Sequence, residues 1–268
     1  DFVHWTEPQL VFVPDYDDDA GSMRRIEAVR PLLNAPDNPA LVRTEFYGVG
    51  NYAAESCTVA FPWILTVNNR GRYRSVDGPI EIQLAASRDL VNWQRHFRVP
   101  TIRRGRVGEW DSGLFYTQCK AIRHNDEIWL YYSGSNFAHG DANHPDNDYQ
   151  RERTSSIGLV KWKLDRFVSA DAGTETGVLT TVPFTYTGSR LELNARVRPG
   201  GSIRAEFLDM AGRPMEGAGP SLPSNGDSLR SRIAWGKNEG IVDRLKGKPV
   251  SLSFHLKSAE LYSFAFRA

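Results

Sequence analysis

A short turn sequence that occurs twice constrains the fold of this chain more than any other feature. Residues 1–5 read Asp-Phe-Val-His-Trp, and residues 89–93 read Asp-Leu-Val-Asn-Trp. The second copy follows residues 80–87, whose apolar and polar side chains alternate as in a strand with one buried face. In such a turn the Asp side chain accepts hydrogen bonds from nearby backbone N–H groups, and the Trp covers the end of the sheet. The repeat therefore predicts sheets that each end in the same turn.

Strand-like segments form two groups in the first part of the chain. Residues 114–122, 127–133 and 156–164 predict one antiparallel meander, and a similar number of strands fits between residues 45 and 93. The first copy of the turn predicts a further opening strand. Sheets of about four strands at such a repeat are typical of β-propellers, which close with about 4 to 8 blades. Two blades cannot close a ring, so the expected partner is an N-terminal polypeptide or a second chain that completes it.

The pattern changes after residue 171. Residues 191–197, 203–207 and 250–256 alternate between apolar and polar side chains, and turns rich in Gly and Pro separate them. We therefore predict an all-β protein with propeller blades over residues 1–171 and a β-sandwich over residues 172–268. A short segment around residues 22–33 is the one helix that the sequence supports.

Composition excludes several classes of function. The 33 Lys and Arg residues nearly balance the 32 Asp and Glu residues, so a nucleic acid is a poor candidate partner. Apolar runs such as residues 59–65 are far shorter than the roughly 20 residues of a membrane helix, so no membrane span is expected. The only cysteines, Cys57 and Cys119, cannot form a disulfide framework or a Cys-rich zinc site, and we expect two buried thiols on strands.

Several motifs resemble those of the five-bladed β-propeller glycoside hydrolases, which include β-fructofuranosidases, arabinanases and β-xylosidases. The resemblance rests on residues 87–93, on Glu55 after an aromatic-rich segment, and on residues 110–113, 128–134 and 157–159. The whole chain also resembles the C-terminal half of bacterial proteins that carry a similar invertase-like domain and end in a β-sandwich. The resemblance implies a secreted or periplasmic protein that acts on a carbohydrate substrate.

The resemblance also implies a catalytic set of carboxyl groups. A glycosidase needs a carboxylic acid to protonate the leaving oxygen and a second carboxylate as base or nucleophile. In the family these groups lie on the first three blades, and the first two would lie outside this chain. Glu55 is the first choice for the general acid and Glu45 is its rival. The alternative for each is a surface Glu at the end of a strand.

Four further residues are candidates for substrate binding. The resemblance implies that Asp111 hydrogen-bonds sugar hydroxyls, that Trp110 or Tyr116 stacks on a sugar face, and that His139 lies at the bottom of the cavity. The alternatives are a turn-capping role for Asp111 and a polar loop position for His139.

Three charged segments have simpler interpretations. Residues 141–148 have enough oxygen ligands for calcium but lack the order of a calcium-binding loop, so we expect a solvated loop and no cofactor. Residues 17–19 predict a hydrated acidic turn, and residues 103–106 predict an exposed basic hairpin tip that touches at most an acidic or sulfated sugar.

Three functions follow as hypotheses. The first is a glycoside hydrolase that cleaves a terminal bond, with furanosides among its candidate substrates. The second is a non-catalytic carbohydrate-binding or adhesion module, in which aromatic side chains form the platform. The third is a structural role, in which the C-terminal domain supports the propeller.

Overall fold

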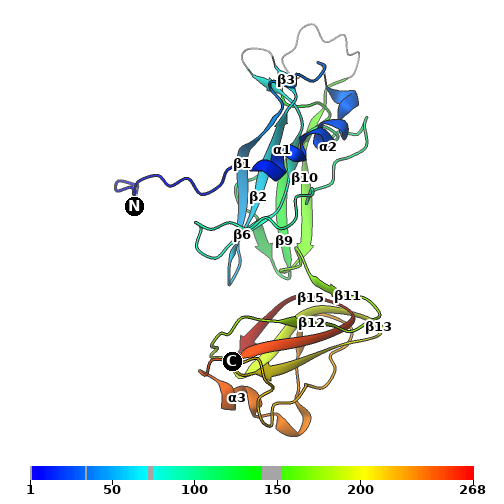
Figure 1. The fold of residues 1–268 in the computed structure, drawn as a ribbon. Coiled ribbons are helices and arrows are strands. Elements are labelled where there is room, and N and C mark those ends of the chain that lie inside the picture. The colour runs from blue at the N-terminus through cyan, green and yellow to red at the C-terminus, as the bar shows by residue number, and fades with distance from the viewer. Residues whose placement is uncertain (1, 34, 72–74, 141–151) are drawn as a thin grey trace. The chain divides into compact units, whose positions relative to one another are not determined.

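The computed structural model describes residues 2–33, 35–71, 75–140 and 152–268 (Figure 1). Strands account for 45% of the chain and helices for 9%, so the predicted all-β class is confirmed. The chain forms two compact units, residues 1–161 and 162–268. The predicted boundary after residue 171 lies instead within strand β11 (Ala170–Ala172), which pairs with a strand of the second unit.

The first sheet of the first unit is four-stranded and antiparallel. Its strands are β1 (Arg43–Ala53), β2 (Thr58–Val67), β5 (Ile80–Ile82) and β6 (Ala85–Ser87). β2 lies at the centre, because it pairs with β1 on one side and with both β5 and β6 on the other. Almost all of β2 is buried, in agreement with its nearly continuous apolar sequence.

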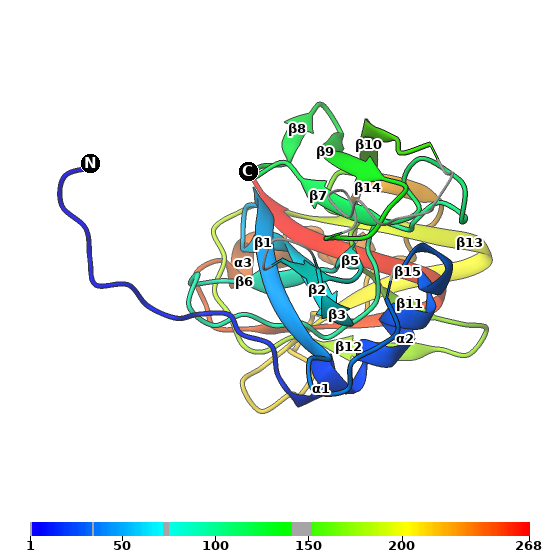
Figure 2. The ribbon, with the colours of Figure 1, turned by 90° about the horizontal axis from the view of Figure 1, so that it is seen from above.

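The second sheet of this unit is also four-stranded and antiparallel. It contains β7 (Leu114–Thr117), β8 (Ile122–His124), β9 (Glu127–Ser135) and β10 (Ser155–Lys163), whose end reaches into the second unit. β9 pairs with the other three strands (Figure 2). β7 contacts β5, β2 and β1 of the first sheet, so the two sheets share a core. A short ribbon of β3 (Asn69–Arg70) and β4 (Val76–Asp77) adjoins them.

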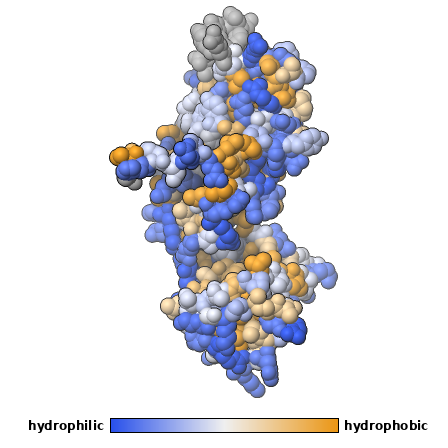
Figure 3. Space-filling view, turned by 60° about the vertical axis from the view of Figure 1, so that its left-hand side comes forward, coloured by the Kyte–Doolittle hydropathy of each residue, from blue (hydrophilic) through white to orange (hydrophobic). Residues whose placement is uncertain are grey.

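The repeated turn forms as predicted in its second copy. The Oδ1 of Asp89 accepts hydrogen bonds from the backbone N–H groups of Val91 and Asn92, at 2.9 and 2.7 Å. Leu90 has a φ of 64°, and the Trp93 indole donates to its carbonyl. The first copy differs, because residues 2–14 are extended and contain no strand. Phe2 and Trp5 on this arm are 89% and 73% exposed. The space-filling view shows the arm projecting from the first unit, with apolar side chains near its end (Figure 3).

Helices cover one side of the first unit. They are α1 (Tyr16–Ala20), α2 (Ser22–Glu27) and the 3₁₀ helix η1 (Arg30–Leu32). The last two lie within the predicted helical segment, whereas α1 was not expected. The prediction of a hydrated turn at residues 17–19 is wrong, because the Asp15 side chain caps α1 and Asp18 is fully buried. The Asp18 carboxylate pairs with Arg95 at 2.7 Å, which offsets the free-energy cost of its burial.

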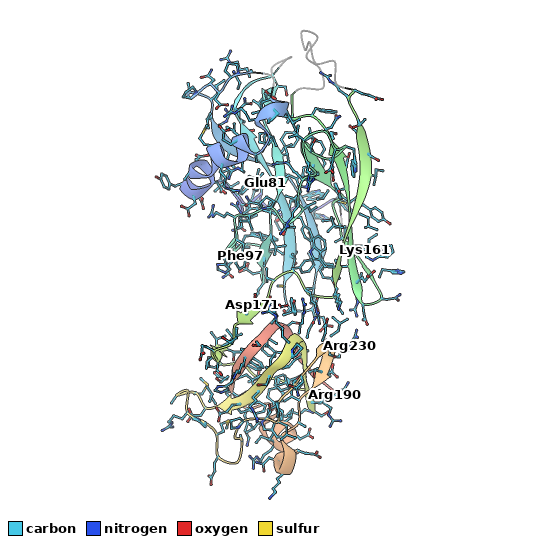
Figure 4. All side chains as sticks on the ribbon, turned by 90° about the vertical axis from the view of Figure 1, so that its right-hand side faces the viewer. Glu81, Phe97, Lys161, Asp171, Arg190 and Arg230 are labelled. Carbon is cyan, nitrogen blue, oxygen red and sulfur yellow. The ribbon has the colours of Figure 1, made fainter. Side chains whose placement is uncertain are left out.

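Arg25 of α2 is the largest fully buried side chain of the described residues. Its guanidinium donates hydrogen bonds to the hydroxyls of Thr44 on β1 and Thr66 on β2, and to the carbonyl of Asp18. The negative charge of buried Glu81 on β5 acts on the same guanidinium (Figure 4). These contacts hold the helices against the face of the sheet that carries Thr44 and Thr66.

Two further expectations about side chains are wrong. Cys57 is half-buried in the turn between β1 and β2, and Cys119 is exposed beyond the end of β7, because neither residue lies on the apolar face of a strand. Arg104 is not at an exposed tip, because its guanidinium donates to the carbonyls of Gly113 and Ile80. Burial lowers the pKa of this guanidinium to about 10.

The second unit is built on one five-stranded sheet in the order β11-β15-β13-β14, with β12 (Gly177–Thr180) also paired to β15. β13 (Arg190–Leu208) and β15 (Ser251–Arg267) are its long central strands, and β14 (Asp227–Arg232) forms an edge. The 3₁₀ helix η4 (Gly236–Asn238) and helix α3 (Ile241–Leu245) follow β14. The sheet is curled, whereas the sequence predicted two sheets packed face to face. Its buried side carries the apolar alternation predicted for this part of the chain.

No helix in the described part of the chain is long and apolar enough to cross a membrane.

Candidate functional site

A β-bulge in β1 turns one tyrosine away from the regular pattern of the strand. Phe46 pairs with Ile64 and Gly48 pairs with Trp63, so Tyr47 has no opposite residue on β2. Bulges re-aim side chains and are frequent beside active sites. The Tyr47 side chain is 48% exposed, whereas Phe46 and Gly48 on either side are half-buried.

Tyr47 belongs to a cluster of four aromatic rings from separate elements, which we name the Tyr47 cluster. Its members are Tyr47 of β1, Trp63 of β2, Tyr116 of β7 and His139 beyond β9. The ring centroids of Tyr47 lie 6.0 Å from Tyr116 and 4.8 Å from His139, and those of Trp63 and Tyr116 lie 5.3 Å apart. The Trp63 indole N–H also donates to the Thr117 hydroxyl at 2.9 Å. The cluster therefore joins the two sheets of the first unit.

Gly48 makes the position of Trp63 possible. A Cβ atom at residue 48 would lie 2.4 Å from the Trp63 ring. The absence of a side chain at Gly48 therefore lets the indole lie across β1 and reach Tyr116.

The hydrogen bonds of His139 define its tautomer. Its Nδ1 lies 2.7 Å from the Val76 carbonyl, and its Nε2 lies 3.0 Å from the Tyr47 hydroxyl. Because a carbonyl can only accept, Nδ1 carries the proton and donates. In the neutral ring Nε2 then accepts from the Tyr47 hydroxyl, so both side chains are held in place.

A carboxylate and an arginine lie beside the cluster. Arg43 and Glu45 are opposite Val67 and Leu65, so they lie on the face of the sheet that also carries Trp63. The Nη2 and Nε of Arg43 lie 2.6 and 2.8 Å from Glu45 Oε1. Both side chains are about two-fifths exposed, at 43% and 39%, so each can still reach a ligand.

A surface hollow of about 450 Å³ adjoins these residues. Leu41, Arg43, Arg70 and Val76 are among its lining residues. Arg43, which lines the hollow, forms an ion pair with Glu45. Val76, which also lines it, accepts a hydrogen bond from His139 through its carbonyl. The volume lies in the range of about 300–1,000 Å³ that is typical of small-ligand sites.

Tyr116 provides a neutral hydroxyl at this site. Burial and the neighbouring Tyr47 raise its pKa to about 12, so the phenol stays protonated at neutral pH. It can therefore both donate and accept hydrogen bonds.

Glu55 lies at the other end of β1 from Glu45. It is exposed in the turn between β1 and β2. Nearby, a hollow of about 310 Å³ is lined by Cys57, Arg88 and Asp89, among others. Because the two glutamates are separated by most of an extended strand, their carboxylates are roughly 30 Å apart. They cannot take part in the same reaction.

Trp110 and Asp111 contact the second sheet through Tyr132. The Trp110 ring stacks on Tyr132 with centroids 5.7 Å apart, and Asp111 accepts a hydrogen bond from the Tyr132 hydroxyl at 2.9 Å. Burial and this carboxylate raise the Tyr132 pKa to about 12. Tyr132 packs against Phe115, whereas Tyr116 points to the opposite side of β7. The structure thus separates Trp110 and Asp111 from Tyr116 and His139.

The acidic stretch at residues 141–148 lies outside the described residues. Among the described residues, no group of three or more His, Cys, Asp or Glu side chains could hold a metal ion.

Sequence reasoning missed Tyr47, Trp63 and Arg43. One signal was present, because glycines at positions 48 and 50 interrupt a strand pattern and such glycines often mark a bulge.

No protein-family model matches the chain, and a search of the curated proteins also finds no match.

Proposed function

We propose that the chain is the carbohydrate-binding part of a glycoside hydrolase, with its site at the Tyr47 cluster. The observation that carries this proposal is the cluster of three aromatic rings and one histidine, with the Arg43–Glu45 pair on the sheet face that carries Trp63 and a hollow that Arg43 lines. These are the groups that a sugar requires. Aromatic faces pack against its C–H groups, and charged or hydroxyl groups bind its hydroxyls.

Within this proposal Glu45 is the better catalytic candidate. It lies beside the aromatic cluster, whereas Glu55 lies at the far end of the strand. A glycosidase needs two carboxyl groups about 5–9.5 Å apart, so Glu55 is too distant to be the second one. In the proposed enzyme a further blade carries that second carboxylate.

The proposed architecture is a five-bladed propeller, followed by a sandwich-like domain, in which an N-terminal polypeptide or a second chain completes the ring. Two observations support it. The first unit contains two small antiparallel sheets of four strands each, in which three strands lie side by side and the fourth pairs with the central strand as well. Phe2 and Trp5 on the arm and Ile157 on β10 are largely exposed, and such apolar side chains are commonly covered by a partner. Secretion or a periplasmic location, in a bacterium, belongs to the same proposal.

Nitrophenol release from a panel of aryl glycosides by the full-length protein, with the blades that complete the ring present, tests the catalytic proposal. We expect turnover of at least one substrate, a loss of roughly 100-fold or more for Glu45→Gln, and no change for Glu55→Gln. Glu55→Gln is the matched control, because it removes the same charge from an exposed position in the turn that follows β1. Equal rates for wild type and Glu45→Gln, or no turnover with any glycoside, would remove Glu45 from catalysis.

A non-catalytic binding module is the second candidate. The observation that favours it is the separation of the two glutamates, which leaves Glu45 paired with a cation rather than with another acid. A glycan array distinguishes the two candidates. The module predicts glycan retention without turnover, loss of retention for Tyr47→Ala, and unchanged retention for Glu45→Gln.

A further inference from the structure

One side of the second unit's sheet is rich in arginine. Along the first half of β13 the residues Leu191, Leu193, Ala195 and Val197 are buried, so the side chains between them form the opposite face. We name this face the arginine face. Figure 4 shows Arg190 and Arg230 together on one side of the second unit.

Cations accumulate at one end of the arginine face. Arg190 on β13 is directly opposite Arg267 on β15, and like charges in this position destabilise a sheet. Arg232 of β14 is opposite Glu192, and Arg230 is exposed beside it. Glu192 already accepts a hydrogen bond from Arg190 at 2.7 Å, so one carboxylate is shared among several guanidinium groups.

In the middle of the arginine face each carboxylate also lies near two cationic side chains. Arg196 and Arg198 both approach Glu260, at 3.9 and 2.7 Å. Lys163 and Arg166 both pair with Asp227, at 3.0 and 2.6 Å. Each of these carboxylates is therefore already neutralised by its own cations.

The arginine face consequently carries a surplus of positive charge. Eight cationic side chains lie on it, and the five carboxylates on the same face are Asp165, Asp171, Glu192, Asp227 and Glu260. The whole chain has a formal net charge of only +1, so the remainder of the molecule is negative overall. The surplus of positive charge is therefore concentrated on the arginine face.

A small hollow lies within this face. Its volume is about 40 Å³, and Asp165, Glu192, Arg230 and Arg267 are among its lining residues. A cavity needs about 10–15 Å³ of such volume to hold one water, so the hollow has room for a small group such as a carboxylate oxygen. Planar guanidinium groups bind planar carboxylates through two parallel hydrogen bonds.

We propose that the arginine face binds a carboxylate-bearing polysaccharide, that is, a chain of uronic acid residues. Carboxylates spaced along an extended chain match arginines spaced along paired strands, and one carboxylate occupies the hollow. A nucleic acid is the poorer candidate, because the formal net charge of the whole chain is only +1. This binding is independent of the function proposed for the Tyr47 cluster.

Affinity electrophoresis of the full chain through gels that contain polygalacturonate tests the proposal. We expect retardation by polygalacturonate, none by neutral dextran, and a loss of retardation in high salt. The double variant Arg230→Gln with Arg232→Gln should bind about tenfold more weakly, since it removes two exposed cations. Arg230→Lys with Arg232→Lys should bind with intermediate strength, because it keeps the charge but not the paired hydrogen bonds.

Lys246→Gln with Lys248→Gln is the matched control, because it removes two exposed charges just after α3, away from the arginine face. It should leave retardation unchanged, and circular dichroism confirms that each variant is folded. Tyr47→Ala should also leave it unchanged, which separates this proposal from that of the sugar site. The proposal is overturned if wild type is not retarded, if both double variants lose binding equally, or if dextran sulfate or duplex DNA binds more strongly than polygalacturonate.

Discussion

Asp15 shows how one side chain can have two roles that experiment can separate. It caps helix α1 by accepting a hydrogen bond from the Asp18 backbone N–H, and it also pairs with Arg98 at 2.6 Å. Hydrogen bonding to Arg98 lowers the pKa of Asp15 from 3.8 to about 2. A carboxylate with a lowered pKa stabilises the folded state above pH 3.8, and this contribution is lost as the pH falls through about 2.

Asp15→Asn isolates the charge, because Asn is an equally good capping residue. We expect the variant to lower the free energy of unfolding at pH 7 by less than about 1 kcal/mol, since the exposed pair is screened by solvent. The difference from wild type should be much smaller at pH 2, where about half of the Asp15 carboxylates are already protonated. Urea unfolding at both pH values measures it. Asp17→Asn is the control, since Asp17 is 72% exposed and 4.0 Å from Arg98. An equal effect of the two variants at pH 7 contradicts the assignment.

Strand β1 shows at the next scale how one element forms a site. Its regular part pairs with β2 on one side and is hydrogen-bonded to Arg25 through Thr44. The bulge leaves Tyr47 without an opposite residue on β2, and the absence of a side chain at Gly48 leaves room for the Trp63 ring. The same strand thus has one face held by the helices and another open to a ligand.

Gly48→Ala tests this account of β1. The added methyl group would overlap the Trp63 ring, so we expect a loss of about 1–3 kcal/mol in the free energy of unfolding. We also expect altered tryptophan fluorescence, since the indole must leave Thr117 and Tyr116. Gly219→Ala is the control, because nothing lies within 4 Å of a Cβ atom there. Unchanged stability and fluorescence for Gly48→Ala would show that the ring moves freely.

The whole molecule consists of two units with separate cores. The second unit buries an aromatic group that includes Tyr186, Phe207 and Phe266, with the Tyr186 and Phe266 centroids 3.7 Å apart. Residues 162–169 belong to this unit through Arg166, which pairs with Asp227, and through the Leu164 carbonyl, which accepts from Asn194.

Two fragments test where the second unit begins. Residues 162–268 should fold alone and unfold cooperatively in urea. Residues 172–268 should be less stable by roughly 2–4 kcal/mol, because they lose Arg166 and leave the buried Asn194 amide and Asp227 without these partners. Equal stability of the two fragments would place the beginning of the unit at residue 172 instead.

Much of the fold can be predicted from local sequence. The alternation of apolar and polar side chains predicted the ends of β9 and β10 to within two residues, and the turn at Asp89 formed as expected. Both features depend on residues that are close together in the sequence. The candidate site was only partly predictable. Tyr116 and His139 were identified, but they meet Tyr47 and Trp63 only through pairing between strands far apart in sequence.

The sequence by itself determined the all-β class, strands such as β9 and β10, and the turn at Asp89, since side-chain alternation and backbone hydrogen bonding act over a few residues. Only the tertiary structure decided which charges are buried and which polar groups meet. Asp18 could be buried because Arg95 reaches it from a distant segment, and Glu45 became a site residue because the register of β1 and β2 places it beside Trp63. These outcomes depend on contacts that no local pattern encodes.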